Sequence, residues 1–193
     1  MTSILKADTI QDSSGNNIIN ENSNTITIGA SGDTITIPAG ATIANSGTAT
    51  GFGKLLQVVT ATDSTARNTN STSFVTASNT LSVSITPSAT SSKIFVIVNT
   101  TAYNNVSGKS MGLSIYRDSS DLGNGTWGMI NSYDTDTSGQ RTIGQPTSMS
   151  VLDSPSSTSS LTYQVYVKTE SGGEIYFNYA NIKASITAFE IAG

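Results

Sequence analysis

Histidine and cysteine are both absent from this chain of 193 residues, which restricts the chemistry that its side chains can perform. Without these residues, the Ser-His-Asp and Cys-His nucleophiles and the usual zinc and iron ligand sets cannot be built. Disulfides are excluded as well, so the fold must depend on burial and hydrogen bonds. We therefore expect no catalytic residue, no cofactor and no metal centre.

Glycoside hydrolysis remains possible without histidine or cysteine, because it needs only two carboxyl groups about 5–9.5 Å apart. Glu170 and Glu174 are the candidate pair. They flank Ser171–Gly173, where surface charge is expected, and their surroundings do not predict the apolar pocket that raises a carboxyl pKa. The sequence therefore favours a protein that is not an enzyme.

The segment Asp134–Gly139 copies the opening of a calcium-binding loop, with oxygen ligands at alternate positions and glycine at the sixth. The position that should carry a bidentate glutamate is Gln145, and no flanking helices are predicted. A solvated Asp/Ser/Gly turn is the favoured interpretation. Cation binding by Asp134 and Asp136 stays open as the alternative.

The sole tryptophan, Trp127, lies with Met129 and Tyr133 in the polar stretch from Asp118 to Gln140. Exposed aromatic residues in polar loops often form binding surfaces, so these three residues are a candidate contact loop. In the competing interpretation, Trp127 and Met129 are core residues of one more strand. Both interpretations are kept.

The composition is polar without being charged. Ser, Thr and Asn form about two-fifths of the chain, whereas charged residues are only 11% and the net charge is −4. The abundant Thr, Ile, Val, Tyr and Phe favour β-strands. The acidic balance predicts no nucleic-acid partner, and no apolar run approaches the roughly 20 residues of a membrane span, so no membrane insertion is expected.

Many short segments after Lys54 alternate apolar and polar residues between turn signals, which predicts an antiparallel sandwich or barrel. Ser171–Gly173 predicts a tight hairpin turn. Ile94–Val98 is apolar throughout, which fits either a central strand or a strand between the core and a neighbouring subunit. The candidate strands are Leu55–Thr62, Ser73–Ala77, Leu81–Thr86, Lys93–Tyr103, Met111–Arg117, Arg141–Leu152 interrupted at Pro146, Leu161–Lys168, Glu174–Tyr179 and Ala184–Ile191.

Residues 1–53 form a separate region, in which Asn24–Gly29 recurs nine residues later as Asp33–Pro38, with a fainter echo at Ala41–Ile43. Period-two alternation makes each copy a candidate short strand with isoleucines on one face. A single chain offers no second layer to cover that face, so several chains must associate. Three chains wound together would bury Ile26, Ile28, Ile35, Ile37 and Ile43 on a common axis. The alternative is a flexible polar arm.

A domain boundary is expected near residue 53, because Gly47–Gly53 contains little besides glycine and small residues. This places the repetitive stalk region at residues 1–53 and a C-terminal head domain at residues 54–193.

The opening Ser3–Asp12, the segment Gly15–Ile19 and the paired Thr-Ile-Thr-Ile units resemble the start of tail-fibre and virion appendage proteins of marine bacteriophages, notably cyanophages. Domains common in those proteins are similar to the carboxy-terminal part, through the segments Gly53–Val59, Ile85–Ile94, Leu152–Pro155 and Ile186–Ile191. The resemblance implies a homotrimer whose amino end attaches to other virion proteins. The chain is nevertheless short for a fibre that reaches the host.

We expect an all-β protein with a repetitive N-terminal stalk and a trimerising β-sandwich of jelly-roll type. Its expected role is structural, on the tail or capsid surface of a phage virion. The partners would be sister copies, other virion proteins, and a host glycan or protein contacted by the C-terminal domain. The alternatives are a capsid decoration or head-fibre protein without a receptor, and a glycan depolymerase.

Overall fold

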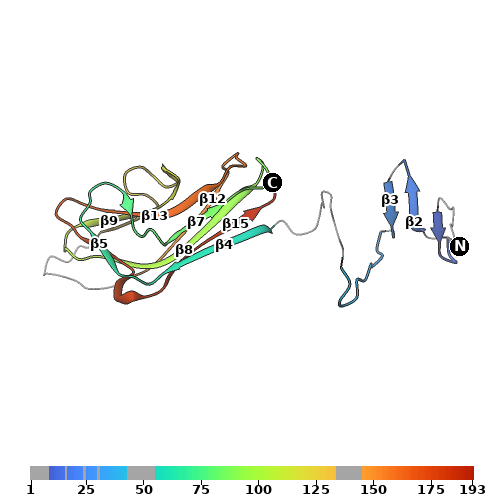
Figure 1. Ribbon diagram of the computed structural model, residues 1–193, viewed down its shortest axis with the longest axis horizontal. Helices are drawn as coiled ribbons and strands as arrows, with labels where there is room; N and C mark the ends of the chain where they lie inside the picture. Colours follow the sequence, from blue (N-terminus) through green and yellow to red (C-terminus); the bar gives the residue numbers. More distant parts are fainter. Residues whose placement is uncertain (1–8, 16, 24, 30, 43–54, 134–144) are drawn as a thin grey trace. The chain divides into compact units, whose positions relative to one another are not determined.

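The computed structural model describes residues 9–15, 17–23, 25–29, 31–42, 55–133 and 145–193. The chain divides into two compact units, Met1–Thr50 and Gly51–Gly193, and the predicted boundary and hinge at 47–53 lie outside the described residues (Figure 1). Regular structure within the described ranges is β throughout, apart from a 3-10 turn at Tyr179–Asn181. No helix in these segments has the length and apolar character that crossing a membrane requires.

The N-terminal unit contains a three-stranded antiparallel sheet in the order β1-β2-β3. Its strands are β1 (Thr9–Gln11), β2 (Asn17–Asn22) and β3 (Thr25–Ile28). The turn after β1 includes Gly15, whose positive φ of 84° suits glycine, and the Asp12 carboxylate accepts a hydrogen bond from the Ser14 amide. The first Thr-Ile-Thr-Ile copy is therefore a strand, as predicted.

The second copy, residues 33–38, was also predicted to be a strand, and this prediction was wrong: the described chain does not pair there as a strand. The first copy, β3, pairs antiparallel with β2, which directly precedes it in the sequence. The second copy is not followed by another such strand within 31–42, and Pro38 lacks an amide donor. Ile43 lies outside the described residues.

The C-terminal unit is a sandwich of two antiparallel sheets (Figure 1). The first sheet contains β4 (Leu55–Asp63), β15 (Ala184–Ile191), β8 (Lys93–Asn104), β12 (Gln145–Asp153), β14 (Ile175–Phe177) and β5 (Arg67–Thr69). The second contains β6 (Val75–Thr76), β7 (Ser82–Ile85), β13 (Leu161–Thr169), β9 (Ser110–Arg117), β10 (Ser120–Asp121) and β11 (Ile130–Tyr133).

The connections of this sandwich give a jelly roll. The first sheet orders its main strands β4-β15-β8-β12, and the second orders them β7-β13-β9-β11. The chain passes from one sheet to the other between β4 and β7, β7 and β8, β8 and β9, β11 and β12, β12 and β13, and β13 and β15. Such crossing connections distinguish a jelly roll from a meander. The predicted all-β class with an antiparallel, jelly-roll-like sandwich is confirmed.

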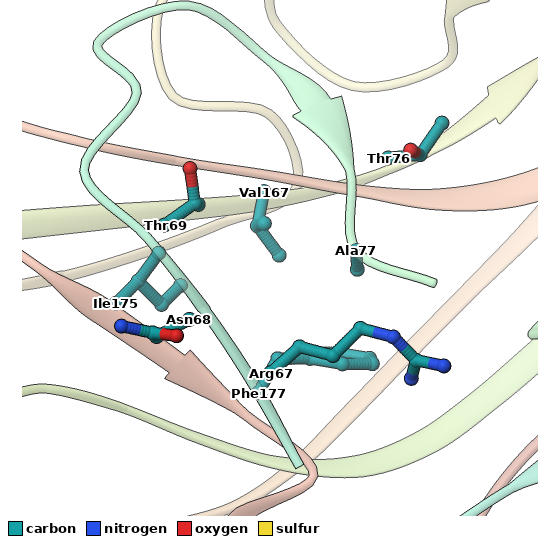
Figure 2. A pocket seen from close by; sticks show the side chains of 8 residues that line it. All are labelled: Arg67, Asn68, Thr69, Thr76, Ala77, Val167, Ile175 and Phe177. Carbon is teal, nitrogen blue, oxygen red and sulfur yellow. The ribbon is translucent and has the colours of Figure 1, made fainter. Parts of the chain in front are cut away.

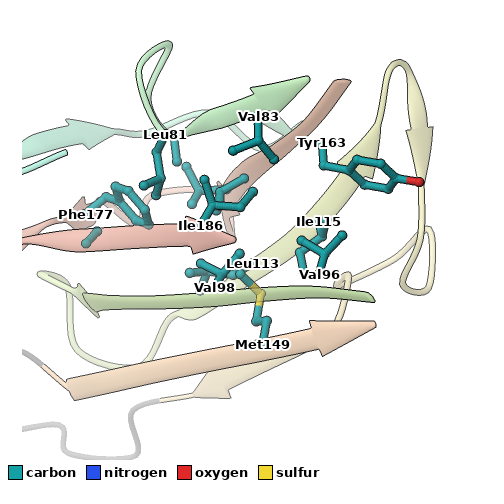
Figure 3. Packing of buried hydrophobic residues seen from close by; sticks show 14 of the residues in the cluster. Leu81, Val83, Val96, Val98, Leu113, Ile115, Met149, Tyr163, Phe177 and Ile186 are labelled. Carbon is teal, nitrogen blue, oxygen red and sulfur yellow. The ribbon is translucent and has the colours of Figure 1, made fainter. Parts of the chain in front are cut away.

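The core lies between the two sheets and is built from alternate residues of the long strands (Figure 3). In β8, Ile94, Val96 and Val98 are fully buried, and they belong to the same cluster as Leu113 and Ile115 of β9. Each such side chain contributes roughly 1.5–3 kcal/mol on leaving water. The period-two pattern that predicted these strands therefore also selects the core residues.

Two local predictions were wrong. The strand expected to be interrupted at Pro146 continues through it, because β12 pairs only with β8 among the described strands, and an edge strand tolerates a missing amide donor. Ser171–Gly173 is not a hairpin turn, since β13 and β14 belong to different sheets. That turn carries the chain from one sheet to the other, with Gly172 at a φ of 80°.

Glu190 of β15 is buried, and its carboxylate binds the loop between β7 and β8 through hydrogen bonds. One oxygen, Oε1, accepts hydrogen bonds from the Ser88 amide (2.6 Å), the Ser88 hydroxyl (2.6 Å) and the Ser92 hydroxyl (2.7 Å). Oε2 accepts one from Gln57 Nε2 of β4 (2.6 Å). Four donors around one carboxylate offset the cost of burying its charge.

The same contacts set the ionisation of Glu190. Burial by itself would raise the carboxyl pKa, but the hydrogen bonds from Ser88, Gln57 and Ser92 outweigh burial and lower that pKa from 4.5 to about 2. A lowered folded-state pKa contributes stability that is present above pH 4.5 and lost as the pH falls towards 2. The contribution is on the order of 3 kcal/mol.

We predict that Glu190→Gln lowers the free energy of unfolding at pH 7 by about 2–4 kcal/mol, because an amide group replaces one of two accepting oxygens. The difference from the wild-type protein should shrink at pH 2.5, where the native carboxylate begins to protonate. Urea unfolding followed by circular dichroism at both pH values measures this. Glu170→Gln is the control for the change in net charge, because the Glu170 carboxylate is half-buried and accepts one hydrogen bond from a backbone amide. An equal loss at both pH values would contradict the prediction.

Candidate functional site

Exposed isoleucines form a row across the N-terminal sheet. Ile10 of β1 pairs with Ile19 of β2, and Ile19 pairs with Ile28 of β3, so the three side chains share one face. Ile26 lies two residues before Ile28 and belongs to the same face. Their exposed fractions are 38% for Ile10, 37% for Ile19, 56% for Ile28 and 67% for Ile26. Within the N-terminal residues that the structure describes, no second layer covers this apolar face.

The remaining predicted stalk residues are equally open. Ile35 is 59% exposed and Ile37 is 47% exposed, although their segment does not pair as a strand. Four of the five predicted stalk isoleucines are thus available to other chains, and the fifth, Ile43, lies outside the described residues. Ile10, Ile18 and Ile19 join them as exposed apolar residues that the repeat did not indicate. Their contact with sister chains stays a prediction.

The predicted contact loop is held on the outer face of the second sheet by Trp127. The Trp127 ring is half-buried, and the Lys168 ammonium lies 4.7 Å from its centroid, a cation–π distance. Lys168 Nζ also donates a hydrogen bond to the Thr126 carbonyl (2.8 Å). A Cβ at Gly112 of β9 would lie 3.2 Å from ring atom Cε3 of Trp127, so glycine allows this close approach.

Met129 and Tyr133 differ in their surroundings. Met129 is half-buried against the core, and its amide donates to the Leu113 carbonyl (2.8 Å). Tyr133, at the end of β11, is 57% exposed. Trp127 and Met129 therefore anchor the loop and precede a strand, whereas Tyr133 alone of the three presents most of its side chain to solvent.

An aromatic cluster beside Trp127 was missed by the sequence analysis. Tyr116 of β9 stacks on Tyr166 of β13 with ring centroids 4.0 Å apart, and Phe74 lies 5.6 Å from Tyr116. Lys168 approaches Phe74 at 5.4 Å and so joins this cluster to Trp127. The available signal was the alternation of β13, which directs Tyr166 and Lys168 away from the core.

The candidate glycoside-hydrolysing pair is engaged in structural contacts. Glu174 accepts hydrogen bonds from Asn68 Nδ2 (2.5 Å) and Asn105 Nδ2 (3.1 Å), one on each oxygen. Glu170 accepts one from the Ser110 amide (3.1 Å). Both carboxylates tie loops to neighbouring strands.

No cluster of three or more potential metal ligands occurs among the residues that the structure describes. Asp134 and Asp136 of the calcium-like segment lie outside those residues, and Gln145 is the first residue of β12. The calcium alternative therefore stays a prediction.

A small pocket opens where the two sheets part (Figure 2). Its volume is about 80 Å³, well below the roughly 300–1,000 Å³ of typical small-molecule sites. Arg67, Asn68, Thr69 and Ile175 come from the first sheet's strands β5 and β14, and Val167 and Thr76 come from β13 and β6. The pocket lies between the edges of the two sheets and has room for at most a few water molecules.

No protein-family model and no curated protein sequence matches this chain. Among solved structures, similarity is found to VP2 of infectious bursal disease virus in a subviral particle, at 13% identity and a TM-score of 0.36, over 71% of this chain and 38% of that chain. A structure of T=1 particles derived from the same virus aligns at 13% identity and a TM-score of 0.38, over 87% of this chain and 45% of that chain. This chain spans less than half the length of either protein.

We predict that Gly112→Ala displaces the Trp127 loop, because the new Cβ would lie 2.8 Å from the Trp127 carbonyl oxygen. Trp127 is the only tryptophan, so its fluorescence reports on this site alone. The emission maximum should shift to longer wavelength and quenching by acrylamide should increase. Gly125→Ala is the matched control, since its Cβ would meet nothing within 4 Å. Unchanged emission in Gly112→Ala would refute the packing of the loop described here.

Proposed function

We propose that this protein is a homotrimeric structural fibre or appendage protein of a phage virion, and that its C-terminal jelly roll contacts the host surface. The observation that carries the proposal is the row of exposed isoleucines in a single-layer sheet, joined to a domain that has its own core. The likeness of both chain regions to phage appendage proteins supports the same assignment.

Association of the N-terminal units would bury the isoleucine rows. Full burial of an exposed isoleucine contributes roughly 1.5–3 kcal/mol. Ile10, Ile19, Ile26 and Ile28 are 37–67% exposed, so burying the rest of each side chain would supply about half of that value per residue towards the entropy of association. Other virion proteins would bind at the amino end, as the resemblance implies. The location is the tail or capsid surface of the virion.

The proposed role is structural rather than enzymatic. Three heads on one stalk would let weak contacts to a host glycan or protein add as avidity. Tyr133 is the exposed member of the predicted contact loop, and aromatic residues of this kind are frequent binding anchors. We place the receptor contact at the end of β11 for this reason.

A second candidate is a capsid decoration or head-fibre protein without a receptor. The packing of Trp127 and Met129 onto their own sheet favours it, because two of the three residues in the predicted contact loop are already engaged. The two candidates share the assembly of three chains and differ only in binding to cells.

For assembly, we predict that mass photometry of the purified chain gives three times the 20.0 kDa chain mass. Ile28→Asp should shift the population to monomers, because association would bury an unpaired charge. Thr27→Asp is the matched control: it adds the same charge at the adjacent position, which faces the other side of β3. A stable wild-type monomer would end the proposal.

For host recognition, we predict that fluorescently labelled wild-type trimer binds host cells and that Tyr133→Ala binds at least about tenfold more weakly, as expected for an interface anchor. Tyr133 is exposed, so its loss should leave the melting temperature unchanged. Wild-type trimer that leaves host cells unlabelled would favour the decoration role.

A further inference from the structure

The outer face of the first sheet carries an apolar row that the described residues of the C-terminal unit leave partly exposed. Val58 of β4 pairs with Phe189 of β15, which pairs with Phe95 of β8, which pairs with Leu152 of β12. Paired residues of an antiparallel sheet point to the same face, so these four side chains lie side by side. Val58 is 49% exposed, Leu152 is 53% exposed, and the two phenylalanines between them are half-buried. We call these four residues the outer apolar row.

Further apolar residues extend the outer apolar row. Leu55 pairs with Ile191 beyond a bulge in β4, and Ile97 lies two residues after Phe95 on the same face of β8. Leu55 is 54% exposed and Leu56 is 48% exposed. A contiguous apolar patch of this extent on a folded domain marks an interaction surface.

The chemistry of this face defines its partner. Of the charged residues in β4, β15, β8 and β12, only Lys93 belongs to the outer face, at its margin, since the alternation directs Asp63, Asp153 and Glu190 inward. One pair of neighbouring hydroxyls is engaged within the sheet: Thr60 Oγ1 lies 2.9 Å from Thr187 Oγ1 and 3.1 Å from the Ile186 carbonyl oxygen. A nucleic acid would find only one positive charge on these strands, and the exposed side chains of the outer apolar row offer a glycan no hydrogen-bonding group. An uncharged apolar protein surface fits.

A sister copy of the same chain meets this requirement. Its own outer apolar row is equally neutral, so the contact buries no pair of like charges. The row also runs from β4 to β12, which are the two ends of the sheet's main strand order. Each domain can therefore present its β4 end to one neighbour and its β12 end to another, as a closed ring of three requires.

The connection to the N-terminal unit strengthens this assignment. β4 begins at Leu55, directly after the region that carries the exposed isoleucines. Once the isoleucine rows hold chains together, sister domains experience an effective concentration on the order of mM, so a modest apolar contact suffices. We propose that the outer apolar row is the contact surface between C-terminal domains of sister copies. This inference rests on the proposed homotrimer.

Single cysteines test the inference directly, because the chain has no native cysteine. Val58→Cys and Leu152→Cys keep a small apolar side chain at each end of the row. Thr158→Cys, in the exposed loop before β13, is the control. Labelling by a maleimide dye is timed in the full chain, and the mass of each sample is measured alongside.

We expect positions 58 and 152 to label at least about tenfold more slowly than position 158, because labelling then requires the contact to open. Loss of the wild-type assembly in either variant, with the control intact, would support the same conclusion. Labelling as fast as at position 158 in trimeric samples would overturn the inference and leave the homotrimer standing. A monomeric wild-type chain would refute both the homotrimer and the contact between sister domains. Slow labelling at positions 58 and 152 in such a monomer would show that the chain covers its own outer apolar row.

Discussion

A sheet with one apolar face needs a second layer, and this constraint governs how the protein must be arranged. The C-terminal unit satisfies it internally, since its two sheets bury Ile94, Val96, Val98 and their partners against each other. The N-terminal sheet has one layer among the residues that the structure describes, and its row of Ile10, Ile19 and Ile28 is exposed there. In the proposed trimer, burial of these isoleucine rows, together with the outer apolar row of the first sheet, would drive the association of sister chains.

A buried carboxylate, that of Glu190, holds the start of β4, which is the first strand of the jelly roll. Glu190 draws together β4, β15 and the loop between β7 and β8 through Gln57, Ser88 and Ser92. At the other end of β4, the buried Asp63 accepts hydrogen bonds from Ser78, Arg67 and the Thr65 amide. Burial alone would raise the pKa of Asp63, but these contacts lower it well below its usual value. Both carboxylates keep β4 in place and so hold the outer face of the first sheet in one geometry.

Within the C-terminal unit, strand positions were predictable where apolar residues alternate. Ala184–Ile191 was predicted with the bounds that the structure has, because every second residue enters the core. Arg67–Thr69 was missed, since a short polar strand gives no such pattern. The two Thr-Ile-Thr-Ile copies look alike in sequence, yet only the first pairs as a strand, because the second ends at Pro38 and finds no strand partner among the described residues.

Contacts between distant residues were beyond the reach of the sequence. The partners of Glu190 lie 98 to 133 positions away, and only the fold brings them together. The same holds for Lys168 of β13, whose ammonium contacts the Trp127 ring. Because of this contact, Trp127 packs against its own sheet, although the sequence offered it as a residue that contacts a receptor. The exposed stalk isoleucines, by contrast, were predictable, because a repeat with one apolar face and no second layer is visible in the residues themselves.

The most direct test of the account is an electron cryo-microscopy structure of the purified full chain. We expect three copies related by a threefold axis, with the Ile10, Ile19 and Ile28 side chains of each copy within about 4.5 Å of apolar side chains of its sisters. Isoleucine rows that face water, or that pack against the jelly roll of their own chain, would contradict it.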